Sequence, residues 1–297
     1  MSNSNTQSEQ NSILLSQAET DDLLETVSEQ IALDTFNSDD QQLLQRLVEC
    51  LGDTRGMTRL SCAQILGKIG EPTTPFLLKA LADHDNVVVR RAAAKTITLI
   101  ADTRAIPQLL DSLLNDDDTV VQGSSVGALA RMGEAAVLPL LEILESPEIP
   151  ESTKGHAAWA LSFIGLPAKA YLYRAIANDS AAVRAAVLGA IAKIAETEPS
   201  QELFDILINS LSDPDSDVRC EAAAVLANLR CPAAIANLIE LLHHTDSESR
   251  RSAALALMKM GDPAAVDPLQ TALDQESEPT VKSIINLAIS QLQPSGS

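Results

Sequence analysis

Aromatic side chains are scarce in this sequence of 297 residues: Phe, Trp and Tyr make up 2% of it, whereas hydrophobic residues as a whole reach 45%. Large single cores normally use aromatic rings to fill volume, so a core of Ala, Leu, Ile and Val favours closely packed helices. The chain also has only 12 glycines and 14 prolines, and it lacks the alternating pattern of half-buried strands. The sequence therefore predicts an all-α protein.

Positive charge is also in short supply, because 21 Lys and Arg face 41 Asp and Glu and give a net charge of −20. Binding to nucleic acid needs cations that displace counterions from phosphate, and an anionic membrane surface repels a chain of this sign. No apolar run approaches the ~20 residues that span a bilayer. The polar N-terminus does not resemble a secretory signal. We therefore expect a cytoplasmic protein that binds neither nucleic acid nor membranes.

Cysteine is too rare for a disulfide scaffold, and no C-x-x-C pair is present. We expect reduced thiols at all four positions, which are Cys50, Cys62, Cys220 and Cys231. The adjacent His243 and His244 lack a third ligand at a suitable spacing, so no metal site is expected. Nucleotide-binding and hydrolase motifs are missing as well.

Repetition is what the sequence has in abundance. One position recurs every 30 to 35 residues before an Ala-rich segment, and a cation occupies it in seven of eight units: Arg59, Arg90, Gln122, Lys154, Arg184, Arg219, Arg250 and Lys282. Such fixed self-similarity is the signature of a stacked solenoid. Each unit is predicted to contain a Leu- and Ile-rich helix, an acidic turn and a second helix with the cation near its start.

Glycines predict where several of the second helices end. Four of them lie eleven residues after the recurring position, where a helix end requires positive φ: Gly70, Gly133, Gly165 and Gly261. We predict one repeat domain over residues 39–292. Residues 1–38 are predicted to be a disordered segment with one helix that caps the first repeat through Leu23, Leu24, Val27 and Ile31, and residues 293–297 to be a disordered tail.

The recurring cation is predicted to be structural. Arg90 and Arg219 each follow an acidic turn. We expect their guanidinium groups to form a ladder of hydrogen bonds to Asp side chains of the preceding repeat.

The repeat resembles the short HEAT-like repeat of the phycobilin lyase family. The pattern is seen in Asp217–Leu226, which reads Asp-Val-Arg-Cys-Glu-Ala-Ala-Ala-Val-Leu, and in Met260-Gly261-Asp262-Pro263. The fourth unit, residues 154–165, is most similar to the phycoerythrin-associated members, which attach bilins to phycobiliproteins. The resemblance covers all eight units and implies a right-handed α-solenoid of about eight helical hairpins.

The resemblance also implies a function. It predicts a bilin lyase that attaches a linear tetrapyrrole, phycoerythrobilin, to a cysteine of a phycobiliprotein subunit of the phycoerythrin class. The acceptor cysteine then belongs to the partner, and a second lyase or chaperone chain is a further expected partner. Because one fold supports many functions, two alternatives stay open: a chromophore-detaching or phycobilisome-disassembly factor, and a non-enzymatic HEAT-repeat scaffold or chaperone.

One face of the second helices is predicted to be unpacked. Counted from the recurring position, residues +3, +4, +7 and +10 are apolar and predict the core, whereas +2, +5 and +9 carry mixed residues. In HEAT-like solenoids the second helix lines the concave surface, so by resemblance this face looks into the groove. The fourth unit places His156, Trp159 and Phe163 there, between the small +5 residues Gly127 and Gly189.

This arrangement predicts a trough for a planar ligand with carboxylates. Arg131, Lys154 and Lys193 are expected to meet the carboxylates, and His156 is the candidate catalytic proton donor because an ordinary imidazole titrates near neutral pH. The remaining candidate binding residues are Ser124, Gly127, Trp159, Phe163 and Gly189, with Tyr171, Tyr173 and Arg174 at the rim. In the alternative interpretation, Trp159 fills a packing gap and His156 is an ordinary surface residue.

Overall fold

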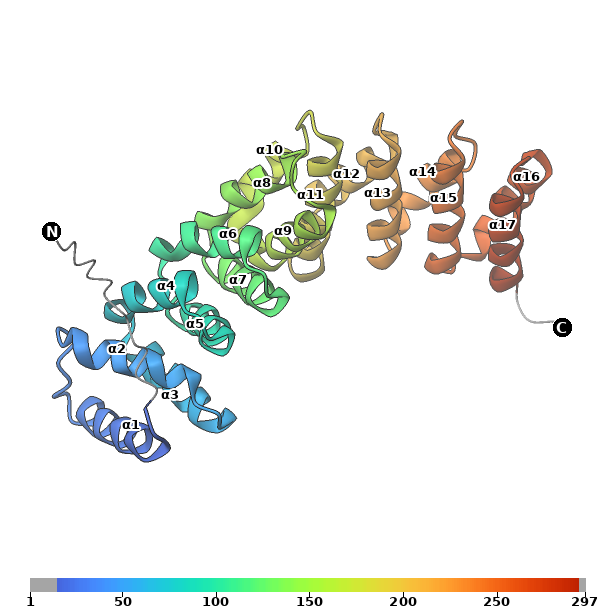
Figure 1. Cartoon of the computed structure of the whole chain (residues 1–297). Helices are drawn as coiled ribbons and strands as arrows, with labels where there is room; N and C mark the ends of the chain where they lie inside the picture. Colours follow the sequence, from blue (N-terminus) through green and yellow to red (C-terminus); the bar gives the residue numbers. More distant parts are fainter. Residues whose placement is uncertain (1–14, 294–297) are drawn as a thin grey trace, which may run out of the picture. The chain divides into compact units, whose positions relative to one another are not determined.

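The computed structural model describes residues 15–293, and all regular structure in this range is helical. The predicted all-α class is therefore confirmed (Figure 1). The predicted disorder of the first twelve residues and of residues 294–297 lies outside the described range. The chain divides into two compact units, Met1–Ala136 and Val137–Ser297, and each is described by itself. No helix of the described range is long and apolar enough to cross a membrane.

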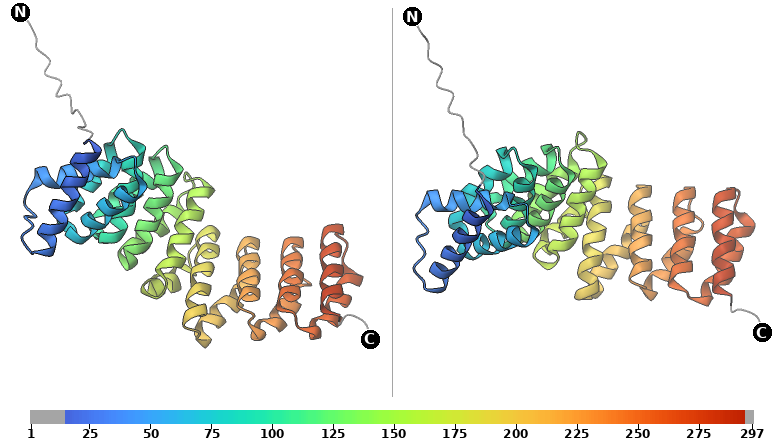
Figure 2. Two further views of the ribbon diagram at one scale, coloured as in Figure 1. Left: turned by 90° about the horizontal axis from the view of Figure 1, so that it is seen from below. Right: turned by 60° about the horizontal axis from the view of Figure 1, so that its bottom comes forward.

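Both units are built from helical hairpins. In the first unit, α1 (Gln17–Ala32) precedes α2 (Gln41–Glu49) with α3 (Gly56–Ile69), α4 (Thr74–Asp83) with α5 (Val87–Ile100), and α6 (Ile106–Asn115) with α7 (Thr119–Arg131). The second unit contains α8 (Val137–Glu145) with α9 (Glu151–Ile164), α10 (Lys169–Ala175) with α11 (Ala181–Thr197), α12 (Gln201–Asn209) with α13 (Ser216–Asn228), α14 (Ile235–Leu241) with α15 (Ser247–Met260), and α16 (Val266–Gln275) with α17 (Pro279–Leu292). All eight predicted hairpins are present. In the second unit, α11, α13, α15 and α17 stand side by side (Figure 2).

Small residues occupy the buried positions of the second helices. Ala93 and Ala94 of α5 are fully buried, and Ile97 one turn later is 1% exposed. Ala222 and Ala223 of α13 are buried in the same way. The predicted core positions +3, +4 and +7 are thus confirmed in these helices, and the aliphatic side chains bury their area against the adjacent hairpin.

The second helices end where the glycine pattern predicts. Gly70, Gly165 and Gly261 follow α3, α9 and α15 with φ between 67° and 79°. Ala101 and Arg230 occupy the same place after α5 and α13, with φ of 57° and 48°. A residue other than glycine is disfavoured at positive φ by about 1 kcal/mol. The sequence therefore predicts this conformation where glycine stands at a helix end, and does not predict it for Ala101 and Arg230.

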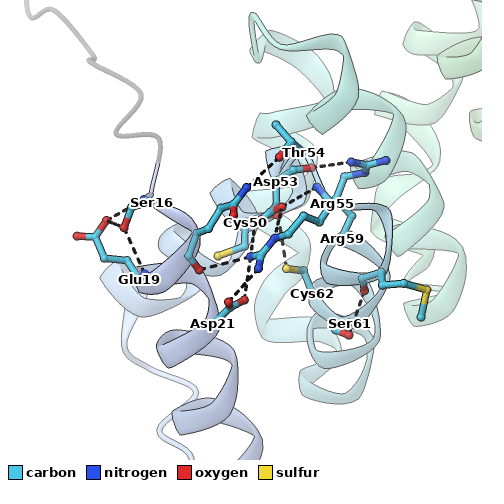
Figure 3. Close-up of polar contacts among 12 residues, drawn as sticks. Ser16, Glu19, Asp21, Cys50, Asp53, Thr54, Arg55, Arg59, Ser61 and Cys62 are labelled. Carbon is cyan, nitrogen blue, oxygen red and sulfur yellow. Dashed lines mark hydrogen bonds and ion pairs between the residues drawn. The ribbon is translucent and has the colours of Figure 1, made fainter.

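A helix, α1, lies where the capping helix is predicted, and it buries Leu23, Leu24 and Val27 and half-buries Ile31. Arg55, in the turn before α3, holds α1 in place (Figure 3). Its Nη1 and Nη2 donate to the two carboxylate oxygens of Asp21 at 2.9 and 2.8 Å. Nε donates to Asp53 Oδ1 at 3.0 Å. Arg55 therefore joins the helix to the acidic turn of the first hairpin.

The recurring arginines form a ladder, but the expectation that they bond the preceding repeat is wrong. Arg250 donates through Nη1 to the carbonyl of His244 in its own turn at 2.9 Å. The other edge of its guanidinium donates to Glu276, in the turn of the following repeat, at 2.7 and 2.9 Å. The side chain leans back toward the start of its helix. One edge of the guanidinium therefore bonds the turn of its own repeat, and the other edge bonds the turn of the following repeat.

The same connection recurs along the chain. Arg90 bonds Asp116 at 2.9 and 3.2 Å, and Arg184 bonds Asp213 at 2.8 and 2.7 Å. Arg219 donates to Ser249 Oγ at 2.8 Å and to Asp246 Oδ2 at 3.4 Å. Each of these arginines ties its second helix to the turn, or to the first helical turn after it, of the next hairpin.

We expect Arg250→Met to lower the free energy of unfolding by about 3 kcal/mol, because it leaves Glu276 as a buried carboxylate without its cation. The Glu276 side chain is only 2% exposed. Arg251→Met is the matched control, since the pair of Arg251 with Glu248 is exposed and should contribute less than about 1 kcal/mol. Urea unfolding followed by circular dichroism measures both, and equal losses would contradict a structural ladder.

The same ion pair predicts a dependence on acid. Hydrogen bonds from Arg250 lower the pKa of Glu276 from its ordinary value of 4.5 to about 2. A carboxyl with a lowered pKa stabilises the fold fully above its unfolded-state pKa and loses that contribution as pH falls through the folded-state value. Between pH 4.5 and 2 the melting temperature of Glu276→Gln should therefore fall less steeply than that of the wild type. Parallel curves over this window would show that the pair does not contribute.

Candidate functional site

Two aromatic side chains of α9 are exposed to solvent. Trp159 is 49% exposed and Phe163, one turn later, is 62% exposed. Their ring centroids lie 5.2 Å apart with an interplanar angle of 28°, which is a stacked pair. The prediction that this face of α9 is unpacked is confirmed, and the alternative in which Trp159 fills a packing gap is not supported.

A pocket of about 470 Å³ opens beside Trp159. It lies along α9, α11 and α13, which follow one another in the stack of the second unit (Figures 1 and 2). Most of its wall consists of small residues. The lining residues are Ala158, Trp159, Ser162, Ala185, Ala186, Gly189, Asp217 and Glu221.

Gly189 forms the middle of the wall in α11. A Cβ atom added there would lie 3.7 Å from Glu221 Oε1, which is an ordinary van der Waals contact. The carboxyl group of Glu221 therefore faces Gly189 across the space between α11 and α13. Because Gly189 has no side chain, the space remains open between the indole on one side and the carboxyl on the other.

The ionisable groups of the pocket are acidic. Glu221 is half-buried, and its burial raises the pKa of the carboxyl above the ordinary value. Among the described residues, Glu221 has no hydrogen bond or ion pair. Asp217 lies one turn earlier on α13 and is exposed. A ligand in this pocket thus meets an aromatic surface, small aliphatic walls and a carboxyl group free to bond it.

The candidate proton donor His156 lies on α9 but does not line this pocket. Its ring is half-buried, and within residues 15–293 its buried Nδ1 has no hydrogen-bond partner. Lys154 lies half a turn earlier, and its ammonium pairs with Glu151 at 3.0 Å. Both residues therefore precede the pocket on the same helix.

Other predicted residues are distributed more widely. Lys193 follows Gly189 by one turn on α11, and its exposed ammonium pairs with Glu196 at 2.6 Å. Tyr173 donates to Glu202 at 3.1 Å, and Arg174 lies over the Tyr171 ring at 6.0 Å. These last three predicted rim residues belong to α10, a first helix, and do not line the pocket.

The remaining predicted residues belong to α7 in the first unit. Ser124 donates its hydroxyl to the carbonyl of Val120 at 2.6 Å. A Cβ atom at Gly127 would meet nothing within 4 Å, and Arg131 is exposed. These residues share the unpacked face of their own helix.

The sequence analysis missed Glu221 and Asp217. Glu221 occupies position +2 of its repeat, the same position as His156 in the fourth unit and Ala186 in the fifth. Following the unpacked face one repeat further would have identified it. Asp217 belongs to the turn end of α13, where acidic residues are common caps, so the sequence distinguishes it less well.

A second pocket of about 450 Å³ lies between the last two hairpins and is lined by polar residues, including His243, His244 and Arg250. His244 Nδ1 accepts from the backbone N–H of Asp246 at 3.0 Å, and Arg250 belongs to the ladder. Within residues 15–293, His, Cys, Asp and Glu form no group of three that could hold a metal ion. The pocket beside Trp159 is therefore the candidate site.

Comparison with known proteins agrees with the repeat pattern. HEAT repeats match residues 74–148 and 202–290. The chain is 36% identical over 279 residues to the "Bilin biosynthesis protein MpeU" of Synechococcus sp. (strain WH8020), with 94% of each chain covered. It is 29% identical over 171 residues to the "Uncharacterized phycocyanin operon protein Z" of Pseudanabaena tenuis, covering 52% of this chain and 81% of that protein. Kap121p bound to the extreme C-terminus of Cdc14p shares the fold at a TM-score of 0.50 and 16% identity, over 95% of this chain and 42% of Kap121p.

Exposure of Trp159 leads to a stability prediction. We expect Trp159→Ala to lower the free energy of unfolding by about 1 kcal/mol or less, because half of the side chain is already in water. Leu161→Ala in the same helix removes a fully buried side chain and should cost about 2 to 5 kcal/mol. Urea unfolding of the two variants measures the difference. A loss at Trp159 as large as that at Leu161 would mean that the indole is part of the core.

Proposed function

Since the chain belongs to the phycobilin lyase family with HEAT-like repeats, we propose that it is a bilin lyase. It binds a free linear tetrapyrrole and attaches it to a cysteine of a phycobiliprotein subunit. The observation that carries this proposal is the pocket of about 470 Å³ beside the exposed Trp159–Phe163 pair. The name of the MpeU relative supports a role in bilin chemistry. The similarity of the fourth unit to phycoerythrin-associated members favours phycoerythrobilin and phycoerythrin.

The pocket suits a flat conjugated ligand. Its volume falls within the range of about 300 to 1,000 Å³ that is common for small-molecule sites. Conjugated rings stack on exposed aromatic faces, and the Ala and Gly walls leave room for an extended molecule. The exposed Asp217 disfavours carboxylates at this end of the site, so the propionates of the bilin are oriented toward Lys193.

The thiols of this chain support an acceptor in the partner. Cys50, Cys62 and Cys231 are at most 5% exposed. Cys220 is half-buried, and burial raises the pKa of its thiol. Burial keeps the first three thiols away from a bilin. The raised pKa of Cys220 lowers its share of thiolate, which is the nucleophilic form of cysteine. The reacting thiol therefore comes from the phycobiliprotein subunit.

Attachment is an addition reaction. The sulfur of the acceptor cysteine forms a bond to the ethylidene carbon of ring A, the carbon–carbon π bond breaks, and the bilin takes up one proton. No oxidant or reductant is needed. The protein contributes orientation of the two reactants and a source of the proton. His156, one turn before Trp159, is the donor proposed from the sequence.

Co-expression with a bilin-producing pathway and candidate phycobiliprotein subunits tests the proposal. We expect one subunit to acquire covalent bilin in a manner that depends on this chain. Gly189→Leu should abolish that attachment because its side chain fills the pocket, whereas Gly189→Ala should retain it because a Cβ atom is accommodated at 3.7 Å from Glu221.

Two outcomes would replace the proposal. Loss of colour from subunits that already carry bilin would indicate a detaching factor. Purified chain that shows no change in bilin absorbance on titration, together with unassisted attachment, would indicate a scaffold without a pigment site.

A further inference from the structure

Glu221 is placed differently from the other carboxylates described above. The acidic residues of the turns bond arginines, as Asp213 and Glu276 do. Glu221 lies instead in the middle of α13, on the wall of the pocket, and within residues 15–293 it has no hydrogen bond or ion pair. A half-buried polar group without a partner costs free energy unless something bonds it. The Glu221 carboxyl is thus available to bond a ligand in the pocket.

The surrounding charges do not neutralise this carboxyl. On α11, the ammonium of Lys193 pairs with Glu196 at 2.6 Å. On α15, Arg251 pairs with Glu248 at 2.9 Å. The remaining ionisable group of the pocket wall is Asp217, one turn away on α13, which has the same charge sign. α9 contributes Ala158, Trp159 and Ser162 to the wall, none of which carries a charge.

Geometry places Glu221 opposite the aromatic surface. Its Oε1 faces Gly189, and Trp159 forms the other end of the same wall. A tetrapyrrole stacked on the indole and extended over Gly189 has its pyrrole nitrogens available to a carboxyl at the pocket wall. A protonated carboxyl accepts hydrogen bonds from pyrrole N–H groups through one oxygen and donates its O–H to the ring nitrogen that carries no proton.

We propose that Glu221, rather than His156, is the catalytic residue that bonds the pyrrole nitrogens of the bilin and gives the proton that the bilin takes up during attachment. This inference rests on the proposed lyase function. His156 does not line the pocket, whereas Glu221 does. The raised pKa of Glu221 supports the role, because burial favours the protonated, proton-giving form of the carboxyl.

The proton balance closes without another reactant. The Glu221 carboxyl gives its proton to a bilin nitrogen, which makes the conjugated system a better acceptor of electrons. The sulfur of the partner's cysteine then bonds the ethylidene carbon, and the π electron pair moves into the conjugated system. The Glu221 carboxylate finally recovers the proton released by the thiol. The net result is addition of sulfur and hydrogen across one double bond.

The test compares Glu221→Gln with His156→Gln in the full chain. Each purified variant is titrated with phycoerythrobilin and followed by absorbance, and covalent attachment to the acceptor subunit is timed separately. We expect Glu221→Gln to bind the pigment but to lose the red shift of a protonated tetrapyrrole. Its attachment rate at saturating bilin should fall by about 100-fold or more. His156→Gln should retain both the shift and the rate within a few-fold.

Different outcomes separate the two proposals. A Glu221→Gln variant with the wild-type spectrum and rate overturns the role of Glu221 but leaves the lyase function intact. A wild-type chain that neither binds bilin nor promotes attachment overturns both. Circular dichroism and the melting temperature confirm folding, and Glu221→Asp, which keeps the acid, should recover part of the red shift if the carboxyl itself is responsible.

Discussion

Burial of alanines at the packed positions of the second helices is the constraint on which the rest of the structure depends. Ala93 and Ala94 in the first unit, like Ala253 and Ala254 in the second, are completely buried. Large side chains at these positions would force the hairpins apart. The single Trp of the chain lies outside this packing, half exposed on the surface of its helix.

The arginine ladder complements this packing. Apolar contacts between alanines are close but non-directional, whereas the bidentate bonds of Arg184 and Arg250 fix the next turn in one orientation. The second helices can then differ freely on their unpacked face. In the second unit this face places Trp159, Gly189 and Glu221 around one pocket, and Phe163 stacks on Trp159 beside it.

Much of the fold was predictable because each sequence signal, such as the recurring cation or the glycine at a helix end, occurs in several repeats. The eight hairpins, the capping helix and the glycine helix ends follow from spacing and periodicity. The direction of the ladder did not, since a sequence gives the donor and acceptor but not which turn lies within reach of the guanidinium. Ala101 and Arg230 adopt glycine-like conformations, which no propensity indicates. Of the predicted site residues, Trp159 and Gly189 line the pocket. Glu221 was not predicted, because a glutamate on a helix of an acidic chain looks like ordinary surface.

The central claim is that a bilin stacks on Trp159, and the fluorescence of this residue tests it directly. Because Trp159 is the single tryptophan of the chain, its emission comes from the proposed site alone. Titration with free bilin should quench this emission almost completely and saturably, at one bilin per chain and in step with the change in bilin absorbance. Bilin that binds, as judged by absorbance, while the tryptophan emission stays largely unchanged would place the pigment elsewhere and contradict the account.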